Sequence, residues 1–258
     1  MLARALIGAA LSAFVAVAAR RTRTLATSGA IAGVVVGTIS IAAGWSWGAL
    51  LLSLFVSAST LSRLGETRKA ERVGPVVEKG GERDAGQVLA NGGVLAVAAL
   101  GSLLAPSPIW YAMGAGAVAA STADTWATEV GTLKGGDPIS IISGRRIAPG
   151  TSGGITLIGT AAGAGGALFI GAVATLANWP GPFAAVALGG VAGALADSLL
   201  GATLQSRRWC ELCATATERL VHTCGTPTRH AGGLAGFDND AVNAACSAVG
   251  ALVALLLS

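Results

Sequence analysis

Long apolar stretches alternate with short polar segments along most of the chain. Charged residues are absent from positions 24–62, 85–123 and 147–196, which are runs of 39, 39 and 50 residues. A helix that crosses a bilayer needs about 20 apolar residues at a rise of 1.5 Å per residue. Each run is therefore long enough for two helices joined by a tight turn.

Helix-ending residues lie near the middle of each run, at Gly44-Trp45, at 105–108 (APSP) and at 178–182 (NWPGP). They predict helices near residues 26–43, 46–64, 86–105, 108–131, 153–177 and 182–204. A first helix at 2–19 and a last at 239–257 bring the number to eight. The pattern thus predicts an all-α, polytopic membrane helix bundle that forms a single integral membrane domain over residues 1–258.

The first apolar stretch has a second interpretation. Residues 1–19 have one early cation, an apolar middle and small residues, as a cleaved signal peptide does. Cleavage would leave seven helices. The basic run that follows at Arg20–Arg23 is more typical of a stop signal than of a mature N-terminus, so we expect the helix to be retained.

The composition excludes a soluble protein. Charged residues make up only 12% of the chain, whereas about 25% is typical of soluble domains, and the mean hydropathy is +0.68. The formal charge of +4 and the pI near 9.2 would suggest nucleic acid as the partner of a soluble chain. Here the positions of the cations explain the charge, so we expect a lipid bilayer and no nucleic acid as partner.

The basic residues orient the bundle. Sixteen of the 17 Lys and Arg lie in four segments, at 20–23, 63–83, 134–146 and 207–229. With eight helices all four segments fall on one side, which the positive-inside rule makes cytoplasmic. We therefore expect cytoplasmic loops at 65–85, 132–152 and 205–237, in a prokaryotic-type plasma membrane. The opposite hairpin tips carry tryptophans typical of an interfacial belt, namely Trp45, Trp47, Trp110 and Trp179.

Several acidic residues lie inside the cytoplasmic thirds of predicted helices: Asp124, Glu129, Asp197 and Asp240. An ionisable group at membrane depth costs a few kcal/mol at least, so it normally faces a polar cavity and marks a functional site. For any one of them the alternative is snorkelling to the interface or pairing with a loop arginine. Acids from three helices at one depth favour a shared cavity.

Polar neighbours of these acids follow helical spacing. They form short stripes that begin at the cytoplasmic end and fade outward: Arg83, Gln87 and Asn91; Asp124 and Thr128; Asn239 and Asn243. This shape predicts a pocket open to the cytoplasm and closed on the other side. A channel would need polar residues along its whole length. The pattern favours an enzyme with one polar reactant and one apolar reactant that arrives from the lipid.

The chemistry of the pocket is suggested by its residue types. Clustered carboxylates with Asn and Thr are hard oxygen ligands of the kind that Mg²⁺ prefers. Phosphate groups would be held by loop cations, with candidates at Lys134, Arg145, Arg146 and Arg229. A glycine-rich turn before a helix exposes backbone N–H groups to an anion, although a plain loop would have the same composition. That turn consists of Gly150, Thr151, Ser152, Gly153 and Gly154.

Three of the four cysteines lie in the last predicted cytoplasmic loop. Cys210, Cys213 and Cys224 have the spacing C-x2-C-x10-C, and His222 and His230 are candidates for a fourth ligand. A reducing compartment makes a disulfide unexpected and a structural Zn²⁺ site plausible. The alternative is a loop with unligated thiols.

Specific strings resemble the transmembrane protein 19 family of integral membrane proteins, which includes the plant phytyl-phosphate kinase of vitamin E synthesis. The similarity runs in order from about residue 25 to the C-terminus. It is carried by 123–131 (ADTWATEVG), 150–156 (GTSGGIT), 197–202 (DSLLGA) and 238–243 (DNDAVN), with 87–93 (QVLANGG) and Arg229-His230 as further matches. Ser152 stands where the family often has Asn, so we expect no side-chain amide contact there.

The resemblance implies an activity: a membrane-embedded, Mg²⁺-dependent phosphotransferase that moves the γ-phosphoryl group of a nucleoside triphosphate, by analogy CTP, to a prenyl monophosphate. Asp124, Glu129, Asp197 and Asp240 would hold the metal, and the turn and cations would hold phosphates. Two alternatives remain open. A cytidylyltransferase forming a CDP-lipid would use the same pocket, and a transporter of phosphorylated lipid would need polar residues further outward.

Overall fold

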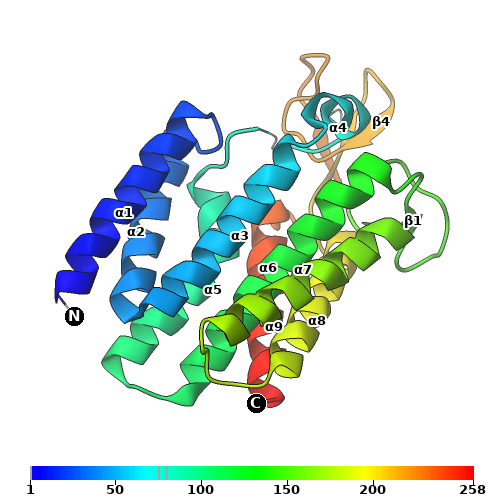
Figure 1. The fold of residues 1–258 in the computed structure, drawn as a ribbon. Coiled ribbons are helices and arrows are strands. Elements are labelled where there is room, and N and C mark those ends of the chain that lie inside the picture. Colours follow the sequence, from blue (N-terminus) through cyan, green and yellow to red (C-terminus); the bar gives the residue numbers. More distant parts are fainter. Residues whose placement is uncertain (1, 75, 79–80) are drawn as a thin grey trace.

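The computed structural model describes residues 2–74, 76–78 and 81–258. Within them, long helices form a bundle with the irregular segments gathered at one end (Figure 1). Lys79, in the predicted loop 65–85, lies outside the described residues. The long helices match the eight predicted ones within a few residues: α1 (Leu2–Arg21), α2 (Thr27–Ala43), α3 (Trp45–Arg63), α5 (Ala85–Leu104), α6 (Pro108–Lys134), α7 (Leu157–Leu176), α8 (Phe183–Thr203) and α9 (Asn239–Leu256).

The largest difference in helix bounds is at the start of α7, which was predicted at residue 153 and begins at Leu157. The preceding residues form β2 (Gly154–Ile155), which pairs antiparallel with β1 (Ile139–Ser140). Thr156 then caps the helix by accepting a hydrogen bond of 3.0 Å from the Gly159 N–H. The helix begins later than predicted because the end of the glycine-rich segment is extended and paired with β1.

Within the described residues, six helices are long and apolar enough to cross a membrane: α1, α3, α5, α7, α8 and α9. The apolar helix α2 is shorter, with 17 residues. Helix α6 is more polar and lies at the centre, where it contacts α3, α5, α7, α8 and α9. All residues from Gly114 to Ala123 are buried. A helix that neighbouring helices surround does not need an apolar surface, which explains why α6 tolerates polar residues.

Small residues bring the central helices close together. A Cβ atom added at Gly193 of α8 would lie 2.3 Å from the Cβ of Ala120 on α6, and one added at Gly250 of α9 would lie 2.4 Å from the same atom. The hydroxyls of Ser121 and Ser247 meet at 2.8 Å between α6 and α9. Close backbone approach and buried hydroxyl contacts are typical of helix packing in membranes.

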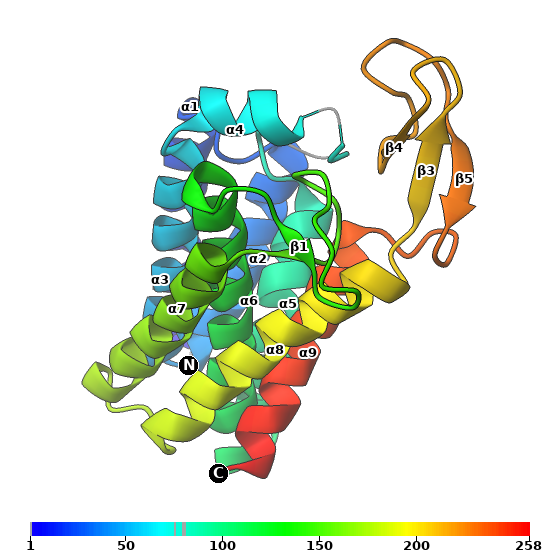
Figure 2. The ribbon, with the colours of Figure 1, turned by 90° about the vertical axis from the view of Figure 1, so that its right-hand side faces the viewer.

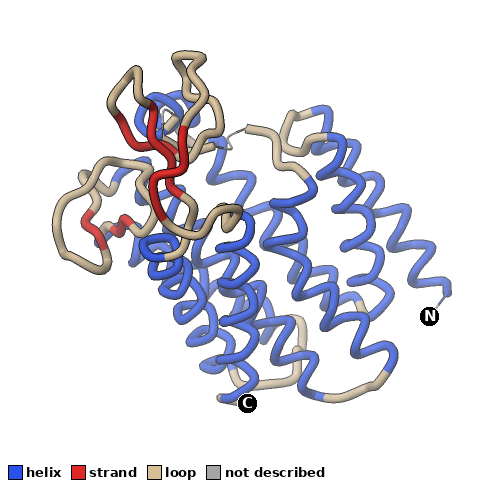
Figure 3. Tube along the Cα trace, turned by 180° about the vertical axis from the view of Figure 1, so that it is seen from behind, coloured by secondary structure: helices blue, strands red, loops and turns tan. Residues whose placement is uncertain are grey.

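The predicted loops contain structure that the all-α expectation did not include. Besides β1 and β2 they form a short helix, α4 (Glu66–Val73), and a three-stranded antiparallel sheet in the order β4-β3-β5. Its strands are β3 (Arg207–Cys210), β4 (Thr215–Thr217) and β5 (Arg229–Gly232). These elements lie at one end of the bundle, and both termini lie toward the other (Figures 2 and 3). We call the first end the loop end.

An aromatic cluster joins the hairpin tips at the opposite end. The rings of Trp47, Tyr111 and Trp179 lie with centroids 4.6–5.2 Å apart, and the Trp179 indole N–H donates a 2.9 Å hydrogen bond to the Tyr111 carbonyl. Trp47 and Trp179 are buried. The prediction of an interfacial belt therefore does not hold for Trp47 and Trp179, because the three hairpins converge and enclose these rings, whereas Trp45 is exposed and Trp110 half-buried.

Candidate functional site

A cavity of about 220 Å³ lies at the loop end. Its walls are formed by α6, α7, α8, α4 and the turn before α7, with one residue from the segment after β4 and one from the start of α9. The polar residues that line it are Arg72, Asp124, Thr128, Thr132, Thr151, Ser152, Thr156, Thr160, Asp197, Ser198, Gln205, Glu218 and Asn239. The cavity therefore brings together residues from distant parts of the chain, several of which the sequence predicted.

Two carboxylates from different helices meet in this cavity. Asp124 on α6 and Asp197 on α8 are close enough for their side chains to share a hydrogen bond. The Oδ2 atom of Asp197 is buried and has no hydrogen-bond partner among the described residues. Two adjacent carboxylates repel each other unless a proton or a cation neutralises them. Together with the hydroxyl and amide groups around them, they fit a divalent cation such as Mg²⁺.

The glycine-rich turn lies directly against α8. Gly153 has a φ of +78°, and a Cβ atom there would lie 2.3 Å from the Cβ of Ala202. Residues Gly150 to Gly154 all line the cavity, and the N-terminus of α7 follows immediately. Only glycine permits this approach at this backbone conformation. The turn and the positive end of the helix dipole thus face the same space as the two carboxylates.

We expect Gly153→Ala to disturb the cavity much more than Gly144→Ala does. Both glycines have positive φ, at +78° and +65°, but a Cβ at Gly144 has no atom of the described chain within 4 Å. Gly144→Ala thus measures the backbone strain alone, about 1 kcal/mol. Gly153→Ala adds the collision with Ala202. The melting temperature in detergent should therefore be lower for Gly153→Ala than for Gly144→Ala, and equal effects of the two changes would contradict the role assigned to the turn.

Two charged residues of the cavity were not predicted. Arg72 of α4 donates a 2.9 Å hydrogen bond from Nη1 to the Thr132 carbonyl and a second one to the Gly136 carbonyl. Glu218 follows β4 and accepts a hydrogen bond from the Ser152 hydroxyl. Both come from predicted loops, where the sequence showed many charges without a periodic signal.

Glu218 has an unusual pKa. Burial raises the pKa of its carboxyl to about 7, while the hydrogen bond from Ser152 lowers it and the charge of Glu78 raises it further. The native state therefore retains a proton that the unfolded chain releases near pH 4.5. It follows that this residue makes the free energy of unfolding fall as the pH rises from about 4.5 to 7.

Glu218→Gln should remove this pH dependence. The amide keeps a hydrogen-bond acceptor for Ser152 but does not titrate. Melting temperatures measured from pH 5 to 8 should thus fall less steeply for the variant than for the wild type, with the difference concentrated below pH 7. Parallel curves would show that Glu218 is already ionised throughout this range.

Glu129 was expected to be a metal ligand, but the structure places it in a different environment. Its carboxylate accepts hydrogen bonds from the ammonium of Lys69 and from the hydroxyl of Ser62. Lys69 is buried and also donates 2.7 Å bonds to the carbonyls of Leu61 and Ser62 at the end of α3. Arg83 joins the group by donating to the hydroxyls of Ser59 and Ser62, at 3.1 and 2.8 Å. This cluster holds α3, α4 and α6 together.

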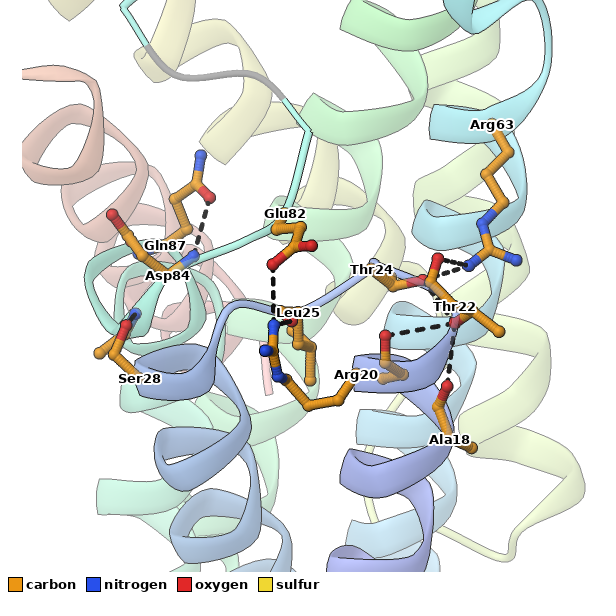
Figure 4. Close-up of polar contacts among 12 residues, drawn as sticks. Ala18, Arg20, Thr22, Thr24, Leu25, Ser28, Arg63, Glu82, Asp84 and Gln87 are labelled. Atoms are coloured by element: carbon orange, nitrogen blue, oxygen red, sulfur yellow. Dashed lines mark hydrogen bonds and ion pairs between the residues drawn. The ribbon is translucent and has the colours of Figure 1, made fainter.

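Residues predicted on α5 and α9 make local contacts at the loop end. Gln87 and Asp84 form a capping box at the start of α5, next to the Arg20–Glu82 ion pair (Figure 4). Asn91 donates a 2.9 Å hydrogen bond to the Gln87 carbonyl. The carboxylate of Asp240 lies against the backbone of α5, 2.3 Å from where a Cβ on Gly86 would be. Asn243 is half-buried on α9, one turn beyond the cavity residue Asn239.

The predicted phosphate-binding cations lie on exposed surface. Two of them form ion pairs: Arg146 with Asp137, at 3.7 Å, and Arg229 with Glu211. The other exposed residues of this group are Lys134, Arg145 and His230. Among the described residues that line the cavity, Arg72 is instead the one cation. Positive charge thus reaches the cavity through Arg72 of α4 rather than through the loop cations that were expected.

The cysteines of the last loop form a second cluster, away from the carboxylates. The ligand atoms of Cys210, Cys213, His222 and Cys224 all lie within 4.8 Å of one another. Of the two histidines considered from the sequence, His222 belongs to this cluster and His230 is exposed on β5. The fourth cysteine, Cys246, is buried within α9.

Comparison with known proteins gives consistent matches along the chain. The family model described as "Integral membrane protein DUF92" matches residues 10–251. Protein PGR of Arabidopsis thaliana is 30% identical over 270 residues, which cover 93% of this chain and 91% of the relative. An uncharacterized membrane protein of Methanocaldococcus jannaschii is 33% identical over 73% of this chain and 78% of its own. No solved structure matches the chain.

Proposed function

Because the chain belongs to the DUF92 family of integral membrane proteins, we propose that it is a membrane-embedded, Mg²⁺-dependent prenyl-phosphate kinase. It would transfer the γ-phosphoryl group of a nucleoside triphosphate, by analogy CTP, to phytyl, geranylgeranyl or a similar polyprenyl monophosphate. The observation that carries this proposal is that Asp124 and Asp197 meet in one cavity with the turn at Gly150–Gly154.

The polar half of the cavity suits a triphosphate. Its lining contains three carboxylates, from Asp124, Asp197 and Glu218, and the guanidinium of Arg72. A triphosphate enters such a site with its divalent cation, whose ligands are commonly carboxylates and phosphate oxygens. Asp124 and Asp197 would hold the Mg²⁺ ion, which would supply positive charge against the phosphate oxygens. The turn and the N-terminus of α7, which line the same cavity, add partial positive charge.

The apolar half of the cavity follows the groove between α7 and α8. Its lining runs along α8 from Gly201 to Val191, which is about 15 Å of helix. Small residues face it from α7 at Gly159, Gly163 and Ala164. Leu195, also in the lining, is 44% exposed on the outer surface of the bundle, where lipid would contact it. A prenyl chain could thus lie in this groove with its phosphate directed toward the carboxylates.

The reaction needs little covalent participation from the protein. The acceptor phosphate is largely ionised at neutral pH, because its second pKa is about 6. Its oxygen attacks the γ-phosphorus, the bond from the γ-phosphorus to the β-bridging oxygen breaks, and the nucleoside diphosphate leaves with that electron pair. The tasks of the chain are to align the two phosphates, to stabilise the charge on the transferred group and to exclude water. The turn, Arg72 and the α7 N-terminus are placed for the first two.

A labelling experiment distinguishes this kinase from its closest alternative. Purified protein is incubated with Mg²⁺, phytyl or geranylgeranyl monophosphate and CTP that carries label in the γ-phosphate or in the cytidine. A kinase puts the γ-label into the lipid and releases CDP. A cytidylyltransferase puts the cytidine into the lipid and releases pyrophosphate, which would replace the proposal. If no nucleotide is consumed with either lipid, the kinase function is wrong.

Nucleotide preference can be measured without turnover. A ligand that binds the native state raises its melting temperature, by an amount that corresponds to about 2.7 kcal/mol at a concentration of 100 Kd. CTP, ATP, GTP and UTP are compared with Mg²⁺ present and then with Mg²⁺ chelated. Stabilisation that requires both nucleotide and Mg²⁺ is the expected result. Stabilisation that is equal without Mg²⁺ would contradict a metal-dependent site.

A further inference from the structure

The segment after α8 folds into two hairpins whose turns face one another. In the first, β3 pairs with β4, and the turn from Cys210 to Cys213 joins them. In the second, the His222 N–H donates a 3.0 Å hydrogen bond to the Thr226 carbonyl, and a bridge links Val221 to Pro227. Each turn thus carries two potential metal ligands, and the pairing of the strands brings all four together.

The distances within the cluster suit a tetrahedral ion. The Cys210 and Cys224 sulfurs are 3.6 Å apart, and the Nδ1 atom of His222 is 3.2 Å from the Cys224 sulfur. Zinc bonds of about 2.3 Å to sulfur and 2.0 Å to nitrogen place sulfurs about 3.8 Å apart and a sulfur and a nitrogen about 3.5 Å apart. A disulfide needs about 2.05 Å, so the cysteines are placed as ligands rather than as a bonded pair.

The backbone of both turns is shaped in the same way. Ala214 follows Cys213 with a φ of 49°, and Gly225 follows Cys224 with a φ of 82°. A left-handed residue directly after the second ligand allows the chain to wrap around a bound ion. For alanine this conformation costs about 1 kcal/mol, so surrounding contacts must hold it.

The hairpin unit also lacks a hydrophobic core that could hold it. Its larger apolar side chains are mostly exposed, as Leu212, Leu220 and Val221 show with exposed fractions of 71%, 60% and 53%. Inside the unit the buried side chains include Cys210 and His222 themselves. Units of this size normally need a metal or a disulfide in place of a core. Two of the four potential ligands, Cys210 and His222, thus belong to the few buried side chains of the unit, together with Thr217 and Thr228, whereas Cys213 and Cys224 are exposed.

We propose that Cys210, Cys213, His222 and Cys224 bind one Zn²⁺ ion that holds the two hairpins together. Three thiolates and one imidazole are soft and borderline ligands that select zinc over Mg²⁺. All four positions of the tetrahedron come from the protein, so the ion is structural and has no place for a substrate. This site is separate from the carboxylate cavity, and the proposal does not depend on the kinase function.

The two hairpins contact the cavity through the segment that joins their turns. The Thr217 hydroxyl donates a 3.1 Å hydrogen bond to the Val76 carbonyl, and the Glu218 N–H donates a 2.8 Å bond to the same carbonyl. Arg219 donates a 3.0 Å bond to the Gly74 carbonyl. The Glu218 carboxyl lines the cavity. Because this segment runs from Cys213 to His222, an ion that fixes both ends also fixes Glu218 at the cavity. Zinc thereby shapes one wall of the carboxylate site.

Metal content provides the first test. The full chain, purified in detergent without chelator, should contain about one zinc per molecule by inductively coupled plasma mass spectrometry. Cys213→Ser and His222→Asn should lower this to background. Matched controls are Cys246→Ala, a buried cysteine on α9, and His230→Asn, an exposed histidine on β5, and both should keep one zinc. Zinc content near zero in the wild type, or equal loss in test and control variants, would overturn the proposal.

Two further measurements cover variants that fail to fold. Wild-type protein loaded with Co²⁺ should show the visible absorption of a tetrahedral site with thiolate ligands. A mass lower by two hydrogen atoms would instead reveal a disulfide and contradict the site. Removal of zinc by a mercurial reagent and chelator should speed hydrogen exchange in residues 205–237 and leave the central residues of α6 protected. Unchanged exchange in 205–237 would show that the ion does not hold the hairpins.

Discussion

Asp197→Asn is expected to lower the rate of phosphoryl transfer by at least about 10²-fold, with little change in the fold. The side chain faces the cavity from α8, touches Asp124, and has an oxygen that is buried without a partner in the described chain. Asparagine has nearly the same shape but removes one charge from the pair. Loss of a single preorganised group that stabilises a transferring charge typically costs 10²–10³-fold in kcat.

Asp137→Asn is the matched control for this change. Asp137 is an exposed acid that pairs with Arg146 at the loop end. Its amide variant should keep full activity and the same requirement for Mg²⁺. The Mg²⁺ concentration that gives half-maximal rate should rise in Asp197→Asn, because one metal ligand is weakened. Full activity of Asp197→Asn at the wild-type Mg²⁺ concentration would remove the carboxylate pair from the mechanism.

Glu129→Gln is expected to lower the free energy of unfolding by about 3 kcal/mol, while the cavity keeps its lining. The Lys69 and Glu129 side chains are only 9% and 21% exposed, and they form an ion pair between α4 and α6. Removing one partner of a buried pair leaves the other charge without compensation, which typically costs 3–5 kcal/mol. Lys69 keeps its bonds to the Leu61 and Ser62 carbonyls, so part of the cost is offset.

The measurement is thermal or denaturant unfolding in detergent, with Glu71→Gln on the exposed face of α4 as control. Lys69→Met combined with Glu129→Leu should recover part of the stability, because the charges are then removed together. The two readouts separate a structural role from a catalytic one. A Glu129→Gln protein with wild-type stability and no activity would restore the metal-ligand role that the sequence indicated.

The helices could be predicted because a bilayer imposes a length and a polarity that local sequence must satisfy. Charge-free runs broken by Gly44 or by Pro180 and Pro182 leave few alternatives to helical hairpins. The bounds of α2, α3, α5 and α8 agree with the predicted ones within about one residue. The start of α7 was predicted too early because residues just before it form β2, which pairs with β1. This pairing joins two segments that are separated in the sequence by the turn, so local sequence does not reveal it.

The candidate site could be predicted in part. Asp124, Asp197, Asn239 and the turn at Gly150–Gly154 line the cavity as expected. Glu129 was grouped with Asp124 because both are acids at similar depth on one helix. Five residues turn an α-helix by about 500°, so the two side chains point about 140° apart. The two side chains therefore face different neighbours. A similar depth along the helix was not sufficient to group the two acids, because the direction of each side chain around the helix also matters.

Glu218 and Arg72 could not be found from local patterns. Glu218 reaches the cavity because two hairpins and a hydrogen bond to Val76 position its strand. Arg72 reaches it because α4 lies across the end of α6. Both positions depend on tertiary contacts between segments that look like ordinary charged loops. The sequence indicated which kinds of group the site needs, but the residues that supply the cation and the third carboxylate were set by packing.

The aromatic cluster at the end opposite the loop end bears on the route by which a molecule could pass through the bundle. A path through the bundle from the carboxylates to its opposite end would have to open the hydrophobic core that includes Trp47 and Trp179, whose rings contact Tyr111 and each other. These rings tie three hairpin tips together, so opening the path would separate all three at once. Under the proposed function, we therefore expect reactants and products to enter and leave the cavity by the loop end or sideways from the lipid, and not through the opposite end of the bundle.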